Sequence, residues 1–143
     1  MVTPKEEKPV VTLAQVKENS EKVIEEKIDA LEISEHEAEF LNAIKKGAFE
    51  SWTKYGILPS VLAGQAVVES DWGTSELALY ANALFGVKAS YWDGKTYVKN
   101  TREVYDGKEE YVDAAFRAYD SWDQSMEDHG EFLSKKLRQK ARG

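Results

Sequence analysis

The pattern of apolar residues changes near residue 91, and this change constrains the fold more than any other feature. Up to Gly86, apolar side chains recur at the three- and four-residue spacing of amphipathic helices. Beyond residue 91, Asp93-Gly94 and Asp106-Gly107 each lie beside residues that favour strands, which is a strong hairpin signal. The sequence therefore predicts an α+β fold, with a mainly helical lobe, a small antiparallel β-hairpin or meander lobe, and a cleft between them.

Helix boundaries are marked by capping boxes, in which a Ser or Thr at the helix start pairs with Glu or Gln three residues later. Three such boxes occur, at Thr12/Gln15, Ser34/Glu37 and Ser121/Gln124. Further helices are expected from Pro59 to about Glu69, and over residues 76–85 before Gly86 breaks the pattern. The helix that follows Ser34 should end at Gly56 and bury Phe40, Leu41, Ile44, Ala48, Trp52 and Tyr55.

Three regions differ in composition. Residues 1–11 contain two prolines and alternating Lys and Glu, which predicts a disordered tail. Residues 12–33 are expected to form a charged amphipathic helix or linker, which could be a stalk, a coiled-coil arm, a helix packed on the domain, or a contact for an assembly partner. Residues 34–143 are long enough to bury a core as one domain.

Composition excludes several classes of protein. The formal net charge of −7 argues against a nucleic-acid binder, which usually carries a basic surface. Cysteine is absent and the two histidines lie far apart, so neither a disulfide framework nor a zinc site is expected. No apolar run is long enough for a membrane span, and the first thirty residues lack the apolar core of a signal peptide.

Glu69 is the first candidate catalytic residue. It shares a helix face with Leu62, Gln65 and Ala66, and a turn at Gly73 follows it. A carboxylate at the end of an apolar helix is expected to lose solvation, which favours the neutral form that a general acid needs near neutral pH. Taken alone, however, a single Glu is more often a solvated or capping residue.

Glu103 is the second candidate. It lies between the two Asp-Gly pairs, on the strand face shared by Tyr97, Lys99, Thr101 and Tyr105. One carboxylate from each lobe, facing across a cleft, suits cleavage of a glycosidic bond. The alternative is an exposed strand residue paired with Lys95 or Lys99. Sugars also stack on aromatic rings, and such rings are plentiful near both acids: Trp72, Tyr80, Tyr91, Trp92, Tyr97 and Tyr105.

Six short segments form an ordered set: Gln65–Ser75 (QAVVESDWGTS), Asn82–Ala89 (NALFGVKA), Trp92–Lys95, Thr101–Glu103, Phe116–Ser121 (FRAYDS) and Ser125–His129. In this order they resemble the motifs of the autolysin-type N-acetylglucosaminidases, glycoside hydrolase family 73. Each segment alone is a weak signal, but together they are specific and cover about residues 38–134.

The resemblance implies a lysozyme-like fold and cleavage of the β-1,4 bond between N-acetylglucosamine and N-acetylmuramic acid in peptidoglycan. The general acid of the family falls on Glu69. Its second carboxylate falls on Glu103, which would activate water unless the N-acetyl group of the substrate assists instead. No metal or organic cofactor is expected. The residues expected to bind the glycan strand are Gln65, Trp72, Tyr80, Asn82, Phe85, Trp92, Tyr97, Thr101 and Tyr105.

The sequence departs from the family pattern at two positions within the motifs and at its C-terminus. Asp71 replaces a Gly before Trp72 and is expected to be a turn residue, and Asn82-Ala83 replaces a paired Asn. The family usually continues beyond the segment that matches Phe132-Leu133 into a helical portion with a cleft tyrosine. The domain is therefore expected to be short at the C-terminus, as a natural short version, a fragment or a degenerate copy.

Two alternatives remain open from the sequence. One is a muramidase or lytic transglycosylase, and the other is a non-catalytic module that binds cell-wall glycan. In every case, the glucosaminidase included, the protein is expected to act outside the cell, in the cell wall or in association with a phage. Among other residues, Asp128 is expected to be solvated or structural and His129 to be a core histidine. Trp52 and Trp122 are expected to lie in the core, and Arg117 and Tyr119 to brace the last helix against the β-lobe.

Overall fold

The structure is a computed structural model that describes residues 12–30 and 32–142. Its contacts divide the chain into two compact units, Met1–Glu32 and Ile33–Gly143. The first unit holds helix α1 (Leu13–Ala30), and the capping box predicted before it is present, with Thr12 N–H donating to Gln15 Oε1 over 2.9 Å. The expected disordered tail, residues 1–11, lies outside the described residues. No described helix is both long and apolar enough to cross a membrane.

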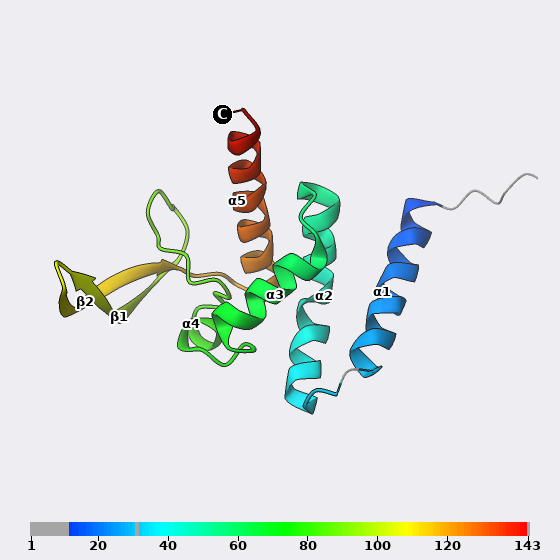
Figure 1. Ribbon diagram of the computed structural model, residues 1–143, viewed down its shortest axis with the longest axis horizontal. Helices are drawn as coiled ribbons and strands as arrows, with labels where there is room; N and C mark the ends of the chain where they lie inside the picture. The colour runs from blue at the N-terminus through cyan, green and yellow to red at the C-terminus, as the bar shows by residue number, and fades with distance from the viewer. Residues whose placement is uncertain (1–11, 31, 143) are drawn as a thin grey trace, which may run out of the picture. The chain divides into compact units, whose positions relative to one another are not determined.

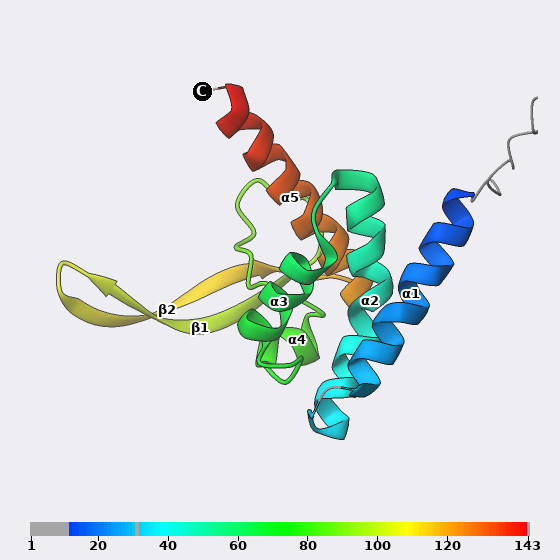
Figure 2. The same ribbon diagram turned by 45° about the vertical axis from the view of Figure 1, so that its right-hand side comes forward.

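The second unit combines four helices with one β-hairpin. Both views show the hairpin projecting away from the helices (Figure 1, Figure 2). The elements in chain order are α2 (Glu35–Tyr55), α3 (Pro59–Ser70), α4 (Glu76–Tyr80), β1 (Thr96–Tyr105), β2 (Lys108–Arg117) and α5 (Trp122–Arg142).

Helix α2 begins and ends as the sequence predicts. Ser34 and Glu37 form the capping box, and Gly56 ends the helix in the left-handed conformation (φ 71°). The prediction that Trp52 is buried is wrong, because the residue is 41% exposed. Small residues take the inward positions near that end of the helix, where Ser51 Oγ donates to Met126 O of α5 over 3.3 Å.

The main core lies where α2, α3 and α5 meet. Buried side chains from these helices, from the loop between α2 and α3 and from the α4 region form one cluster: Phe40, Ile44, Ala48, Ile57, Leu62, Ala66, Ala78, Leu84, Phe85 and Met126. Helices α2 and α5 approach closely because Gly130 faces Ser51. A Cβ at position 130 would stand 2.6 Å from Ser51 Oγ.

The sheet has two strands, β1 and β2, in an antiparallel register that pairs Thr96 with Arg117 and Tyr105 with Lys108. Asp106 and Gly107 connect them, both with positive φ (51° and 76°), as a two-residue hairpin turn requires. Asp93-Gly94, in contrast, does not connect two strands. Of the two arrangements that the sequence allows, the described residues therefore form the hairpin and not the meander. The indole N–H of Trp92 donates to Lys95 O over 2.8 Å and closes this segment into a loop.

Helix α4 is shorter than the sequence predicts. It ends at Tyr80 instead of extending to residue 85. Asn82 adopts a positive φ of 51°, and its side-chain amide donates to Tyr119 O over 3.1 Å. The chain therefore turns here, so that Leu84 and Phe85 enter the core from a loop.

The glycine contacts predict opposite effects for two helical glycines. Gly130→Ala should destabilise the protein by about 1–3 kcal/mol, because its Cβ would collide with Ser51. Gly64→Ala, in α3, is the matched control: nothing lies within 4 Å of its Cβ, so the better helix propensity of Ala should stabilise by up to about 1 kcal/mol. Urea denaturation of both variants measures the free energies of unfolding, and equal effects would contradict the close α2–α5 contact.

Candidate active site

A tight turn positions the end of α3, which carries Glu69. The next residue, Ser70, is fully buried; its hydroxyl donates to Ala66 O over 2.5 Å and accepts the Gly73 N–H over 2.9 Å. Asp71, Trp72 and Gly73 all have positive φ (50°, 55° and 77°), which ends the helix sharply. Asp71 is thus the turn residue that the sequence predicts.

The turn is packed against the core. A Cβ on Gly73 would stand 2.7 Å from the ring of Phe40 and 2.8 Å from that of Trp122, so only glycine fits. Trp72 lies edge-on to Phe40, with ring centroids 6.2 Å apart, and its carbonyl accepts a hydrogen bond from His36 Nε2 over 3.1 Å. Trp72, expected to be a sugar platform, is therefore partly buried against the core.

Glu69 itself is exposed to solvent, so the expectation that it loses solvation in the free chain is wrong. The buried line of α3 runs through Leu62, Ala66 and Ser70, and Ser70 takes the inward position at the helix end. Within residues 12–30 and 32–142, no hydrogen bond or ion pair holds the Glu69 carboxylate. Its oxygens are free to meet a ligand.

Glu103 lies on the more buried face of β1, where its side chain is 26% exposed. Lys88 Nζ lies 3.0 Å from Glu103 Oε1, and Thr101 Oγ1 donates to the same oxygen over 3.4 Å. The cross-strand neighbour of Glu103 is Glu110, so the partner is Lys88 instead of Lys95 or Lys99. The hydrogen bond to Glu103 raises the pKa of Lys88, which keeps its ammonium group charged.

The tyrosines of the expected glycan site differ in exposure. The Tyr97 hydroxyl donates to Glu76 Oε2 over 3.0 Å, which ties β1 to the start of α4 and raises the pKa of Tyr97. Tyr80, at the end of α4, is 72% exposed, and Tyr105, at the end of β1, is also exposed. The Tyr80 and Tyr105 side chains are therefore accessible to a sugar.

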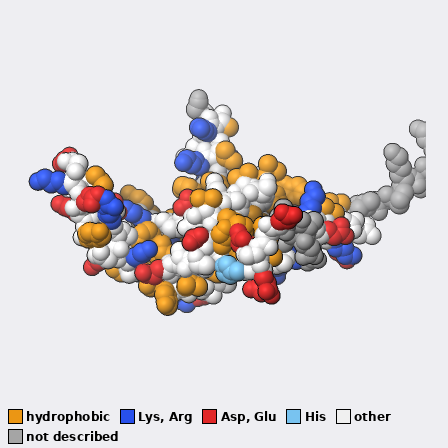
Figure 3. All heavy atoms as spheres, turned by 60° about the horizontal axis from the view of Figure 1, so that its bottom comes forward, with side chains coloured by type: hydrophobic (Ala, Val, Ile, Leu, Met, Phe, Trp, Pro, Cys, Tyr) orange, Lys and Arg blue, Asp and Glu red, His pale blue; other side chains and the backbone are white. Residues whose placement is uncertain are grey.

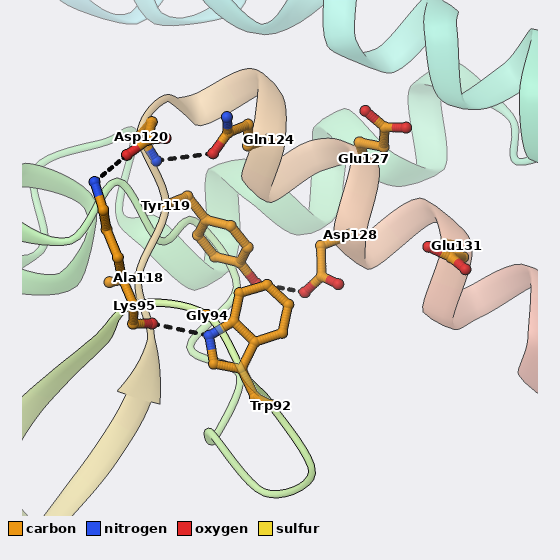
Figure 4. Close-up of a pocket in the computed structure, with 10 residues that line it drawn as sticks. All are labelled: Trp92, Gly94, Lys95, Ala118, Tyr119, Asp120, Gln124, Glu127, Asp128 and Glu131. Atoms are coloured by element: carbon orange, nitrogen blue, oxygen red, sulfur yellow. Dashed lines mark hydrogen bonds and ion pairs between the residues drawn. The ribbon is translucent and has the colours of Figure 1, made fainter.

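Trp92 belongs to a polar cluster that joins the sheet to α5. Arg117 lies over its ring, 4.7 Å from the centroid, and binds Asp128 at 2.9 Å. The Tyr119 hydroxyl donates to the same carboxylate (Figure 4), and burial together with this hydrogen bond raises the pKa of Tyr119 strongly. The prediction that Arg117 and Tyr119 brace the last helix is confirmed. Trp92 is thus held in place and lines one side of a pocket of about 410 Å³.

His129 links α5 to α3. Its Nε2 lies 2.9 Å from Gln65 Oε1, one helical turn before Glu69. Its ring stacks on Phe85, with centroids 4.0 Å apart. Burial lowers the pKa of His129 to about 4, against the opposing charge of Asp128. The sequence predicts a core histidine at this position, but it holds no signal for the contact between His129 and Gln65.

Side-chain contacts and short stretches of chain thus link the surroundings of the two carboxylates. Gln65 and Glu69 share α3, and Gln65 meets His129, which stacks on Phe85. Three residues after Phe85, Lys88 binds Glu103. Lys88 is not among the site residues expected from the sequence. Its place in the same NALFGVKA segment as Phe85 is the signal that points to it.

Charges of both signs surround the hairpin, and basic side chains mark the end of α5. Figure 3 shows Lys and Arg mixed with Asp and Glu at the hairpin end, on its left side. The final turn of α5 carries Lys140 and Arg142, which complement the helix dipole.

The buried imidazole predicts a pH dependence of stability. In the unfolded chain His129 takes up a proton near pH 6.5, whereas in the folded chain it does so only near pH 4. Between these values the unfolded state binds more protons, so stability falls as the pH is lowered through this window. Denaturation of His129→Phe and the unmodified chain at several pH values checks this. The variant should show a shallower decline from pH 6.5 to 4, and parallel curves would contradict a neutral, buried His129.

Comparisons with known proteins agree on one family. The glucosaminidase family model, described as mannosyl-glycoprotein endo-beta-N-acetylglucosaminidase, matches residues 45–142. Exo-glucosaminidase LytG of Bacillus subtilis is 42% identical over 112 residues, which are 78% of this chain and 39% of that protein. A probable N-acetylmuramidase of Lactococcus lactis is 40% identical over 96 residues, 66% of this chain and 21% of that protein.

A solved structure is also similar. The catalytic domain of the autolysin Auto from Listeria monocytogenes superposes with a TM-score of 0.64 at 31% identity, covering 88% of this chain and 68% of that one. The chain spans about two fifths or less of the length of the two curated relatives named above. On the family match and the shared fold, the chain belongs to the glucosaminidase family of glycoside hydrolases, with its lysozyme-like α+β fold.

Proposed function

We propose that the protein is a peptidoglycan hydrolase that cleaves the β-1,4 bond between N-acetylglucosamine and N-acetylmuramic acid. The observation that carries this proposal is the match of residues 45–142 to the glucosaminidase family, with an open carboxylate at the end of α3. A second carboxylate, Glu103, lies on the β-hairpin. The relatives support the substrate class, since one is a glucosaminidase and another an autolysin.

Glu69 is the proposed general acid. Its carboxylate is exposed in the free chain and its backbone is fixed by the packed turn at Gly73. A glycan strand laid over α3 would displace water from the carboxylate, and a drier environment favours the neutral acid. The protonated carboxyl group would then donate to the leaving glycosidic oxygen.

Glu103 is the proposed second carboxylate. The ion pair with Lys88 at 3.0 Å and the contact with Thr101 hold it in one place. As a carboxylate, Glu103 would accept a proton from an attacking water molecule or stabilise an oxocarbenium-like transition state. Lys88 would thus position Glu103 without touching the substrate.

The remaining contacts would orient the glycan. Exposed rings at Tyr80 and Tyr105 offer faces for stacking, and Gln65 offers an amide beside Glu69. The other residues proposed for the glycan site make contacts within the protein, so we assign them mainly to shaping the site. They are Trp72, Asn82, Phe85, Trp92, Tyr97 and Thr101.

The proposed place of action follows from the substrate. Peptidoglycan lies outside the cytoplasmic membrane, so the protein would act in the cell wall or as part of a phage. Residues 12–33, with the acidic and basic side chains of α1, are a proposed contact for an assembly partner.

A muramidase is the second candidate, because relatives from Lactococcus lactis are named as probable N-acetylmuramidases. The products distinguish the reactions. Reducing N-acetylglucosamine ends support the proposed glucosaminidase, reducing N-acetylmuramic acid ends support a muramidase, and anhydro ends support a lytic transglycosylase. Binding to purified wall without any product would support a non-catalytic module.

Removal of the acid should abolish turnover. Glu69→Gln keeps the shape of the side chain but has no proton to donate, so the rate on purified peptidoglycan should fall on the order of 10²–10⁴-fold. Asp71→Asn, two residues away in the same turn, is the matched control and should retain most of the activity. Reducing-end release measures both rates. Equal rates for Glu69→Gln and the unmodified chain would rule out Glu69 as the acid.

Two substitutions on the hairpin test the role of Glu103. Glu103→Gln should lower kcat by roughly 10²-fold or more if Glu103 activates water. Glu110→Gln removes the directly opposed carboxylate of β2 and should leave kcat nearly unchanged. Wild-type kcat in Glu103→Gln would instead favour assistance by the N-acetyl group of the substrate.

A further inference from the structure

We propose that His129 is a positioning residue that orients the Gln65 amide, so that its NH2 group faces the glycan as a hydrogen-bond donor beside Glu69. The acceptor would be an acetamido carbonyl or a hydroxyl group of the amino sugar. This inference rests on the proposed function, and it gives a role to a residue that the sequence alone places in the core.

Two aromatic rings lie nearly parallel to the imidazole and orient its plane. Phe85 stacks on it at a centroid distance of 4.0 Å and an interplanar angle of 16°. Phe132, one turn along α5, stacks at 5.9 Å and 21°. Phe85 is 8% exposed and belongs to the core, so its ring gives the imidazole a fixed support. The Nε2 atom therefore has a defined direction, toward α3.

The buried second nitrogen fixes the tautomer. His129 Nδ1 is buried and has no hydrogen-bond partner among the residues that the structure describes. A buried N–H without an acceptor is rarer in proteins than an acceptor without a donor. The proton therefore belongs on Nε2, which donates to Gln65 Oε1 over 2.9 Å. The low pKa of His129, about 4, keeps the imidazole in this neutral form near neutral pH.

The orientation of Gln65 follows from this hydrogen bond. Gln65 Oε1 accepts the hydrogen bond from His129. The NH2 group of the same amide therefore does not bond to His129 and remains available as a donor. Gln65 is half-buried and lines a groove of about 380 Å³ between α3 and α5, together with apolar residues such as Val61 and Leu133. Glu69 lies four residues further along α3, on neighbouring helix surface. The arrangement thus offers a donor next to the proposed acid.

Three variants separate positioning from packing. His129→Phe keeps a flat ring against Phe85 but cannot donate, whereas His129→Gln keeps a planar group with N–H donors. Gln65→Met removes the amide and keeps its length. We expect His129→Phe and Gln65→Met each to lower kcat/KM on peptidoglycan glycan strands by about 3- to 10-fold, the worth of one neutral hydrogen bond. His129→Gln should recover part of this loss.

The double variant decides whether His129 acts through Gln65. If it does, His129→Phe combined with Gln65→Met should lose no more kcat/KM than Gln65→Met alone. Thermal unfolding of the same proteins separates a loss of stability from a loss of function. Losses that multiply in the double variant, or unchanged kcat/KM in His129→Phe, would overturn the proposal.

A spectroscopic measurement tests the orientation without any turnover. Nitrogen-15 NMR of the unmodified chain should show His129 as the Nε2–H tautomer at neutral pH, assigned by its loss in His129→Phe. The Gln65 side-chain amide resonances should shift in the same variant. An Nδ1–H tautomer would contradict the proposal even in an active enzyme. An unmodified chain that releases no product but shows the Nε2–H tautomer would instead refute the proposed function and support the orientation.

Discussion

The buried hydroxyl of Ser70 closes the end of α3, and the position of the proposed acid depends on this closure. Ser70 bonds backward to Ala66 and forward to Gly73, so three successive left-handed residues can follow the helix. Gly73 in turn packs against rings of the core, where no side chain would fit. The result is a rigid backbone with an exposed carboxylate at Glu69. This combination suits an acid that must wait for its substrate to exclude water.

Helix α5 connects this turn to the rest of the site. Its different faces contact different elements: Asp128 binds Arg117 at the end of β2, His129 binds α3, and Glu127 binds Lys54 of α2 at 2.9 Å. The Ser125 hydroxyl accepts the Leu84 N–H over 3.0 Å and anchors the loop that carries Phe85 and Lys88. One helix therefore sets the relative positions of the helix that carries the first acid and the hairpin that carries the second.

Local signals in the sequence predict local structure well. The capping boxes at Thr12 and Ser34, the left-handed Gly56 and the Asp106-Gly107 turn are all confirmed, because each depends on residues a few positions apart. The errors share a different cause. They concern features that depend on segments distant in the sequence. These features are the exposure of Trp52, the ion pair of Glu103 with Lys88, and the contact between His129 and Gln65. The sequence correctly predicts that Glu69 lies at the end of a helix. The side chain buried at that end, however, is that of Ser70.

In the proposed mechanism a glycan strand binds over the end of α3, with its scissile bond between the two lobes. The decisive experiment is a crystal structure of Glu69→Gln with an N-acetylglucosamine–N-acetylmuramic acid oligomer. We expect a glycosidic oxygen about 3 Å from the side chain of residue 69, with the sugar ring also facing the hairpin. A strand bound only in the pocket lined by Trp92 and the acidic face of α5, with residue 69 open to solvent, would contradict it.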